Sequence, residues 1–159
     1  MRPKPFVPES LNESGPYVRD QTSSLVWHQC GLRTLYADTD RSQVVYHANY
    51  LRYFEFGRAS LMRDSSYPYR EIEDSGFIYP IISTGLDYFR PLQYDDAMLI
   101  HTRPGERARV KLRFDYVITH APTGDIVCTG FTRHCAVNAK GIPVEIDEKT
   151  VRLWEIFPE

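Results

Sequence analysis

The sequence lacks the features that mark several large classes of protein. It has only three cysteines, Cys30, Cys128 and Cys135, and this odd number without CxxC spacing predicts reduced thiols rather than a disulfide framework or a zinc module. No apolar run approaches the roughly 20 residues of a membrane-spanning helix. The first residues also lack the continuous apolar stretch of a secretion signal. We therefore expect a cytoplasmic protein without a membrane span.

An excess of charge of either sign is also missing. The chain has 19 basic and 21 acidic residues and a net charge of −2, so no overall basic field exists to hold nucleic acid. Its content of 42% hydrophobic and 25% charged residues argues against intrinsic disorder. A length of 159 residues suits one domain with one core.

Proline is concentrated at the start of the chain. Residues 1–23 carry four prolines, with serine, asparagine and glutamate between them. Such a composition buries little surface, so we expect a proline-rich extension that is loose or draped over a partner. Residues 24–159 are then expected to form a single domain, in which we find no internal repeat.

The first half of this domain predicts one strand and one long helix. A strand is expected over residues 25–36, where apolar, aromatic and β-branched types are mixed. Apolar residues recur with the helical period over residues 47–63. They cover more than half of the helix circumference, which predicts a well-buried helix. Its apolar positions lie at steps of four, three and four residues: Tyr50, Phe54, Gly57 and Leu61. A short helix is expected at Tyr69–Asp74, ended by Gly76.

The second half predicts antiparallel strands. Four β-rich segments cover residues 77–89, 97–104, 107–120 and 125–138. The sequences PGE, APTGD and NAKG read as turns, and the last two predict successive hairpins. Asp147 is expected to cap a terminal helix. This order predicts an α+β fold in which an antiparallel β-sheet is wrapped around a long central α-helix.

The most informative stretch is the polar loop that leads into the expected helix. It holds Asp38 and Asp40, with Tyr36 four residues before Asp40 and His47 seven residues after it. The first N–H groups of a helix have no partner within it, so they can bind an oxyanion or a polarised carbonyl. One loop can thus gather a carboxylate, an imidazole, a phenol and free amides. That set suits hydrolysis of an activated acyl group without a metal.

The residues alone leave a plainer interpretation open. Aspartates in a loop most often close turns, and a histidine at a helix start is most often a cap or a surface group. The other histidines are scattered over separate segments, and no His or Cys cluster has metal-ligand spacing, so we predict no metal site. On residue chemistry alone the loop is a candidate site.

The loop and the helix together resemble a known family. The string DTDRSQVVYHANYLRYFEFGRASLMRD is similar to the defining segment of hotdog-fold acyl-CoA thioesterases, in the 4-hydroxybenzoyl-CoA thioesterase and YbgC-like group. The segments ISTGLDYFRPLQYDDAMLIHTR and HCAVNAKGIPVEI resemble the second strand and the closing hairpin of that family. The resemblance covers roughly residues 25–157. It implies the hotdog fold and the hydrolysis of an acyl-CoA to a carboxylic acid and coenzyme A.

The resemblance also implies roles for individual residues. Asp40 matches the catalytic carboxylate, as nucleophile or as general base toward water. His47 matches the histidine at the helix start, whose backbone N–H would polarise the thioester carbonyl, and Tyr36 matches an accompanying tyrosine. Asp38 matches a residue that holds the loop. The candidate substrate-binding residues are Gln43, Tyr46, Asn49 and Arg90.

Two positions depart from the family pattern. Gln43 stands where many members have glycine, so the loop either takes another path or presents an amide to the pocket. Asp95 precedes Asp96 where a Gly-Asp pair is usual. Because aspartate tolerates the left-handed conformation better than most residues, that turn is expected to survive.

The implied substrate carries its own coenzyme, so no separate cofactor is expected. Its anionic nucleotide end calls for cations, although arginines at strand ends are equally often only solvated. Five arginines are candidates for the phosphates: Arg90, Arg103, Arg107, Arg109 and Arg113. By analogy with the family we also expect a homodimer or homotetramer with active sites at the dimer interface.

Two other functions use the same fold. A hotdog hydratase or dehydratase would act on hydroxyacyl thioesters with a histidine and an acidic partner, and Glu55, eight residues after His47, is the residue available for that pair. A non-catalytic acyl-CoA-binding protein would bind without turnover, and Gln43 is the feature that keeps this alternative open.

Overall fold

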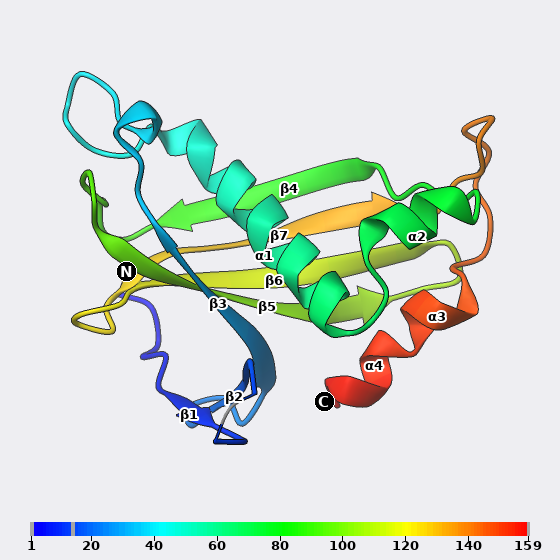
Figure 1. Cartoon of the computed structure of the whole chain (residues 1–159), viewed down its shortest axis with the longest axis horizontal. Helices are drawn as coiled ribbons and strands as arrows, with labels where there is room; N and C mark the ends of the chain where they lie inside the picture. Colours follow the sequence, from blue (N-terminus) through cyan, green and yellow to red (C-terminus); the bar gives the residue numbers. More distant parts are fainter. Residues whose placement is uncertain (1, 14, 159) are drawn as a thin grey trace.

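The computed structural model describes residues 2–13 and 15–158. Two short 3₁₀ helices, η1 and η2, lie between the first strands and the long helix. The elements follow in chain order in Figure 1: β1 (Pro8–Ser10), β2 (Tyr17–Asp20), β3 (Val26–Arg33), η1 (Tyr36–Asp38), η2 (His47–Asn49), α1 (Tyr50–Asp64), α2 (Tyr69–Asp74), β4 (Ile81–Tyr88), β5 (Ala97–Arg107), β6 (Lys111–His120), β7 (Ile126–Cys135), α3 (Glu148–Val151) and α4 (Leu153–Ile156).

The described strands form one antiparallel sheet. Its order is β1-β2-β3-β5-β6-β7-β4, so β4 lies at one edge and pairs with β7 alone. The APTGD turn joins β6 to β7 as the expected hairpin. Figure 1 shows α1 lying across one face of the sheet, called here the helix face, while the opposite side is the outer face. This arrangement confirms the predicted α+β class with a long helix against an antiparallel sheet.

The helix α1 approaches the sheet closely at Gly57. A Cβ atom at this position would lie 2.6 Å from side-chain atoms of both Ile100 and Thr102 on β5, so only glycine fits without a shift. One turn earlier, the ring of Phe54 stacks on that of Tyr116 with centroids 4.2 Å apart. Burial of a side chain of this size stabilises the fold by roughly 1.5–3 kcal/mol. The predicted apolar stripe is therefore the contact surface of the helix.

The first residues of the chain differ from the loose extension that their composition predicts. β1 and β2 form a hairpin that pairs with β3 and extends the sheet. Phe6 packs against the rings of Trp27 and His101, with centroids 5.6 and 4.4 Å apart. Pro8 is tolerated because β1 is an edge strand, where a missing N–H costs no ladder bond. Two buried apolar side chains, Phe6 and Val18, and the hydrogen bonds accepted by the Asp20 carboxylate thus hold this proline-rich segment on the domain.

Two predicted turns also differ. β5 continues through Pro104 and Gly105, with a register shift against β6 between Pro104 and Arg107, so PGE is not a turn. Such an irregularity accommodates the missing N–H of proline inside a strand. The NAKG turn is present, with Gly141 at φ +78°, but it closes a single bridge between Val137 and Pro143.

The C-terminal helix begins where its sequence predicts. The Asp147 carboxylate accepts the backbone N–H of Thr150 at 3.1 Å, so it is the N-cap of α3. The following α4 buries Leu153, and Phe157 just beyond it is also buried. Within the two described ranges, no helix is long and apolar enough to cross a membrane.

Candidate active site

The segment between β3 and α1 is held by a buried aspartate. The Asp38 carboxylate accepts the backbone N–H of Leu35 at 3.0 Å and the hydroxyl of Tyr53 at 2.9 Å. Its carbonyl oxygen accepts the N–H of Tyr46 and the side-chain amide of Asn49, both at 2.9 Å. Burial and the neighbouring carboxylate raise the pKa of Tyr53, so its phenol remains a donor. Asp38 therefore holds the loop, as expected.

Asp40 lies on the opposite, exposed side of the same segment. Its Oδ1 atom accepts the N–H of Ser42 at 2.8 Å, and its carbonyl accepts the N–H of Gln43 at 3.0 Å. These bonds close a tight turn in which Gln43 has φ +65°. Gln43 thus keeps the left-handed conformation that glycine favours, and Asp95 does the same at φ +66°. The two departures from the family pattern leave both turns in place.

The helix begins just after this turn. η2 runs directly into α1, and the N-cap residue Tyr46 provides no side-chain cap. Among the described residues, the backbone N–H groups of His47 and Ala48 have no hydrogen-bond acceptor. Free N–H groups at the positive end of a helix favour an oxyanion or a polarised carbonyl oxygen. This part of the predicted chemistry is present.

His47 lies beside the edge strand β4. Its carbonyl oxygen accepts the hydroxyl of Tyr88 at 2.8 Å, and the Tyr88 ring meets that of Tyr50 edge to face at 5.4 Å. Burial raises the pKa of Tyr50 to about 12 and also raises the pKa of Tyr88. Both phenols are therefore neutral near pH 7, and the Tyr88 hydroxyl can fix the position of the helix start.

The predicted site residues divide between two hollows of this chain. One hollow, with a volume of about 360 Å³, is lined by Tyr36, Thr39, Asp40, Gln43, Gln93 and Tyr94. The other, of about 300 Å³, is lined by Val45, His47, Tyr50, Tyr88, Phe89, Arg90 and Pro91. Tyr46 and Asn49 line neither of them, and Asn49 is occupied with the Asp38 carbonyl. Asp40 and His47 thus line different hollows of this chain.

Arg90 is already engaged with its own chain. Its guanidinium donates to Asp125 at 2.7 Å and to Thr123 at 3.0 Å, both in the turn between β6 and β7. This contact ties the end of β4 to that turn. Arg90 still lines the hollow beside His47, where it supplies a positive charge.

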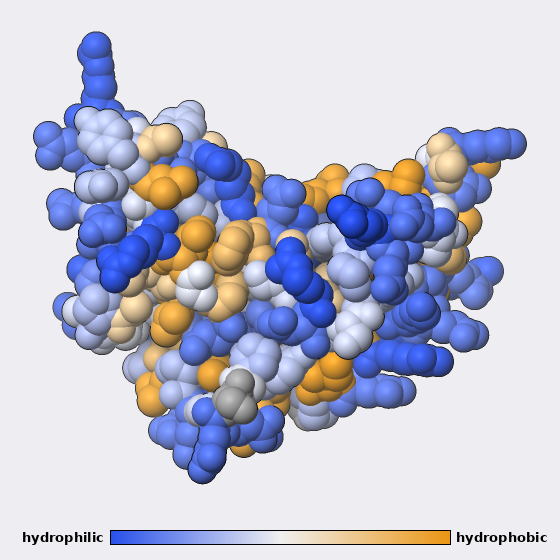
Figure 2. All heavy atoms as spheres, viewed as in Figure 1, coloured by the Kyte–Doolittle hydropathy of each residue, from blue (hydrophilic) through white to orange (hydrophobic). Residues whose placement is uncertain are grey.

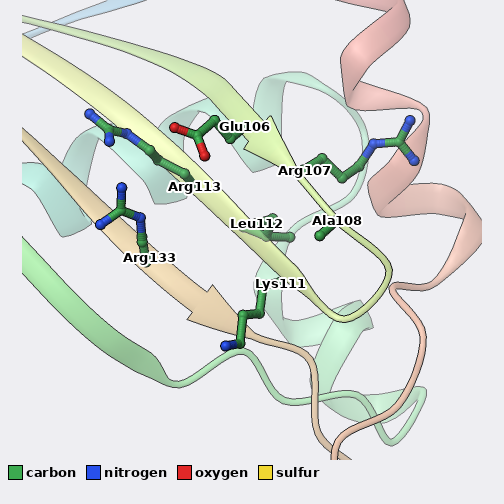
Figure 3. Close-up of a pocket in the computed structure, with 7 residues that line it drawn as sticks. All are labelled: Glu106, Arg107, Ala108, Lys111, Leu112, Arg113 and Arg133. Carbon is green, nitrogen blue, oxygen red and sulfur yellow. The ribbon is translucent and has the colours of Figure 1, made fainter.

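The other four arginines proposed for the phosphates are distributed unequally. Arg103 is buried and donates to the carbonyl of Val26, and Arg109 pairs with Glu145 at 2.6 Å. Arg107 and Arg113 instead line a cleft at the end of β5 and β6, together with Lys111, Arg133 and one acid, Glu106 (Figure 3). This cleft lies at the other end of the sheet from the Asp40 turn.

A further groove runs between β3 and α1. It has a volume of about 370 Å³ and is lined by Leu32, Arg33, Leu35, Asp38, Arg52, Tyr53, Glu55, Phe56 and Ala59. Figure 2 shows apolar side chains gathered on this side of the molecule. Glu55 faces this groove, whereas His47 lines the hollow at the helix start. The two residues proposed for a hydratase pair therefore do not share a site.

Sequence reasoning missed several residues of the two hollows. Tyr88 was assigned only to a strand, and Gln93 and Tyr94 were given no role, yet each lines a hollow with a predicted site residue. Tyr88 is separated from His47 by 41 positions in sequence, so no local pattern could reveal their hydrogen bond. In the part of the chain that the structure describes, no group of three or more His, Cys, Asp or Glu could hold a metal ion.

An antiparallel sheet packed against one long helix, with an aspartate-bearing turn leading into the start of that helix, is the arrangement expected of hotdog-fold thioester hydrolases. The sequence pattern of the Thioesterase-like superfamily matches residues 35–153. The chain belongs to this family, which confirms the resemblance, the fold and the expectation of a thioesterase.

Known relatives agree with this assignment. The chain is 29% identical over 124 residues to "Putative acyl-CoA thioesterase YneP" of Bacillus subtilis, covering 78% of this chain and 85% of that protein. A solved structure of a hypothetical protein from Aquifex aeolicus has a TM-score of 0.75 at 29% identity, covering 79% and 97% of the two chains. The 1,4-dihydroxy-2-naphthoyl-CoA thioesterase from Synechocystis, at 19% identity and a TM-score of 0.74, covers 79% and 93% and shares the fold.

Proposed function

We propose that this protein hydrolyses the thioester of an acyl-CoA to a carboxylic acid and coenzyme A. One observation carries the proposal: the loop held by Asp38 presents Asp40 on an exposed turn and, a few residues later, two backbone N–H groups without partners. A thioester needs both a base or nucleophile and donors for the oxygen that becomes negative. A single segment supplies them.

The reaction follows from these groups. The carbonyl oxygen of the thioester accepts the N–H groups of His47 and Ala48, which polarises the carbonyl carbon. With Asp40 as general base, a water oxygen bonds to that carbon while one of its protons passes to the carboxylate. The carbon–sulfur bond then breaks, and the thiolate of coenzyme A leaves and takes up the proton. With Asp40 as nucleophile, an acyl–carboxylate intermediate forms first and water cleaves it.

The remaining predicted residues surround this centre. Tyr36 and Gln43 share the hollow of Asp40, and Arg90 shares that of His47. We assign Tyr36 to the reacting end and Gln43, Tyr46, Asn49 and Arg90 to substrate binding. Coenzyme A is part of the substrate, so the reaction needs no further cofactor.

The basic cleft suits the anionic end of this substrate. Arg113 and Arg133 are directly opposite each other on β6 and β7, and Figure 3 shows both extending to the same side. Like charges in directly opposite positions destabilise a sheet unless an anion lies between them. Asp115 compensates Arg113 at 2.7 Å. We therefore assign this cleft to the phosphates of coenzyme A.

The active site is completed by a second copy of the chain in this proposal. The free edge of β4 carries Ile81 and Ile82, which are 49% and 50% exposed. Antiparallel pairing of this edge with its copy would place the Ile81 end of one β4 beside the Tyr88 end of the other. That brings the end of the partner's sheet that bears the basic cleft toward the His47 end of this chain. Sedimentation should then give the mass of two or four chains, and the cytoplasmic location stays a prediction.

The test is release of free thiol from a panel of acetyl-, hexanoyl-, palmitoyl-, benzoyl- and 4-hydroxybenzoyl-CoA. We expect at least one to be hydrolysed and Asp40→Asn to lower kcat by about 10²-fold or more, the scale for loss of a proton-transferring group. Asp74→Asn is the matched control, because Asp74 is exposed on α2, away from both hollows. Binding of acyl-CoA without turnover, unchanged in Asp40→Asn, would instead support a binding protein.

A further inference from the structure

Gln43 holds a conformation that its residue type disfavours. Four described residues other than glycine have positive φ: Ser24, Gln43, Ser66 and Asp95. Short polar residues adopt this left-handed region at modest cost because their side chains can bond to nearby backbone, whereas longer ones gain no such bond. Gln43 is the one long side chain in this set. A strained backbone of this kind persists at functional sites when the side chain has a task there.

The turn itself does not need a glutamine. Its backbone bonds run from Gln43 N–H to the Asp40 carbonyl and from Asp40 N–H to the Val44 carbonyl, both at 3.0 Å. Glycine would make the same bonds without a Cβ in the left-handed region. The reason for glutamine therefore lies in its side chain.

That side chain lies in the hollow of Asp40. Within the described chain, no hydrogen-bond partner occupies the Gln43 amide, and it lines the hollow with the Asp40 carboxylate. The Ser42 N–H fixes Oδ1 of Asp40 at 2.8 Å, which leaves Oδ2 to face an incoming molecule. A carboxylate oxygen and an amide oxygen on one short turn form a pair of acceptors.

We propose that Gln43 positions the water that attacks the thioester, an inference that rests on the proposed function in its general-base form. Asp40 Oδ2 accepts the proton that is transferred, and the amide oxygen of Gln43 accepts the other hydrogen of the same water. The lone pair of the water oxygen then points at the carbonyl carbon. As that bond forms, the first proton moves to Asp40 and later to the departing sulfur, while the second stays on the new carboxylic acid.

Three variants test this role. Gln43→Gly removes the amide and relieves the backbone, so we expect Tm to rise by about 2 °C while kcat falls about tenfold, the scale of a misplaced reactant. KM should change less than twofold, since the water rather than the thioester loses a contact. Ser66→Gly is the matched control, because it relieves the same conformation at the end of α1, outside both hollows. Its Tm should rise and its kcat should not change.

Gln43→Asn separates the amide from the backbone. Asparagine tolerates the left-handed region and keeps an amide oxygen, so its kcat should lie several-fold above that of Gln43→Gly. The proposal is overturned if Gln43→Gly keeps kcat within twofold of the wild type, or if Gln43→Asn is no faster than Gln43→Gly. If the wild type releases thiol from no acyl-CoA, the proposed function is wrong and this inference fails with it.

Discussion

The two sides of the loop between β3 and α1 differ in almost every physical respect. On the buried side, Asp38 is 3% exposed and its carboxylate accepts three hydrogen bonds from its own chain, from Leu35, Tyr53 and Arg52. On the exposed side, two residues later, the Asp40 carboxylate accepts one hydrogen bond, from the N–H of Ser42. Two aspartates in one DTD motif thus have opposite surroundings and, in the proposed mechanism, opposite tasks. In this proposal, Asp38 holds the backbone of the loop that presents the reactive carboxylate of Asp40.

The largest effect on this comparison is expected from acid, because acid acts on buried titratable groups. Burial lowers the pKa of His101 and His134 to about 4, from an ordinary value of 6.5. Below pH 6.5 these histidines are protonated in the unfolded chain, whereas in the folded chain they stay neutral down to about pH 4. The free energy of unfolding should therefore fall as the pH drops through that window, by about 1.4 kcal/mol per pH unit for each histidine.

Urea unfolding at pH 7, 6 and 5 measures this effect. The stability should be nearly constant above pH 7, where these histidines are neutral in both states. His134→Gln should reduce the pH dependence of the free energy of unfolding by the contribution of one histidine, since glutamine does not titrate. A free energy of unfolding that rises as the pH falls from 6.5 to 5 would show that these rings are protonated in the folded protein.

Removing one hydrogen bond should weaken the buried side alone. Tyr53→Phe deletes the donor to the Asp38 carboxylate and leaves the ring in the core. We expect the free energy of unfolding to fall by about 2 kcal/mol, the scale for a bond to a charged group. Tyr94→Phe is the matched control for stability, because its ring is 59% exposed. An unchanged stability in Tyr53→Phe would mean that Asp38 does not hold the loop.

A smaller effect is expected where strand β4 meets the helix start. Tyr88→Phe removes the hydroxyl that donates to the His47 carbonyl and keeps the ring against Tyr50. The N–H groups of the first turn should then be less well positioned, and kcat should fall about threefold while KM changes little. Tyr79→Phe is the control, because it deletes a phenol hydrogen bond to the carboxylate of Asp147, outside both hollows. It should lower stability and leave kcat unchanged.

Local signals explain the part of the fold that the sequence predicts. The stripe through Phe54, Gly57 and Leu61 locates α1, and α2 spans the predicted residues Tyr69–Asp74 ahead of Gly76. Asp147 was predictable in the same way, because a cap depends only on residues of the next helical turn. By contrast, the N-terminal hairpin depends on Phe6 reaching Trp27 and His101, across distances in sequence that no local pattern encodes. Composition alone therefore gave the wrong expectation for that segment.

The candidate site shows the same division. The family motif locates Asp40 and His47, and the DTD loop lies where the motif places it. Adjacency in sequence suggested one pocket, but in this chain the two residues line separate hollows. Tyr88 and Gln93 come to these hollows from beyond α2, so only the folded sheet reveals them.

Asp40→Asn and Asp38→Asn, measured side by side, test the account most directly. For each variant, kcat is measured by thiol release from the best acyl-CoA and the free energy of unfolding by urea. The account predicts that Asp40→Asn loses about 10²-fold in kcat with its stability unchanged, while Asp38→Asn loses about 2 kcal/mol of stability. The opposite pattern, a stable and nearly inactive Asp38→Asn beside an active Asp40→Asn, would contradict the division of tasks within this loop.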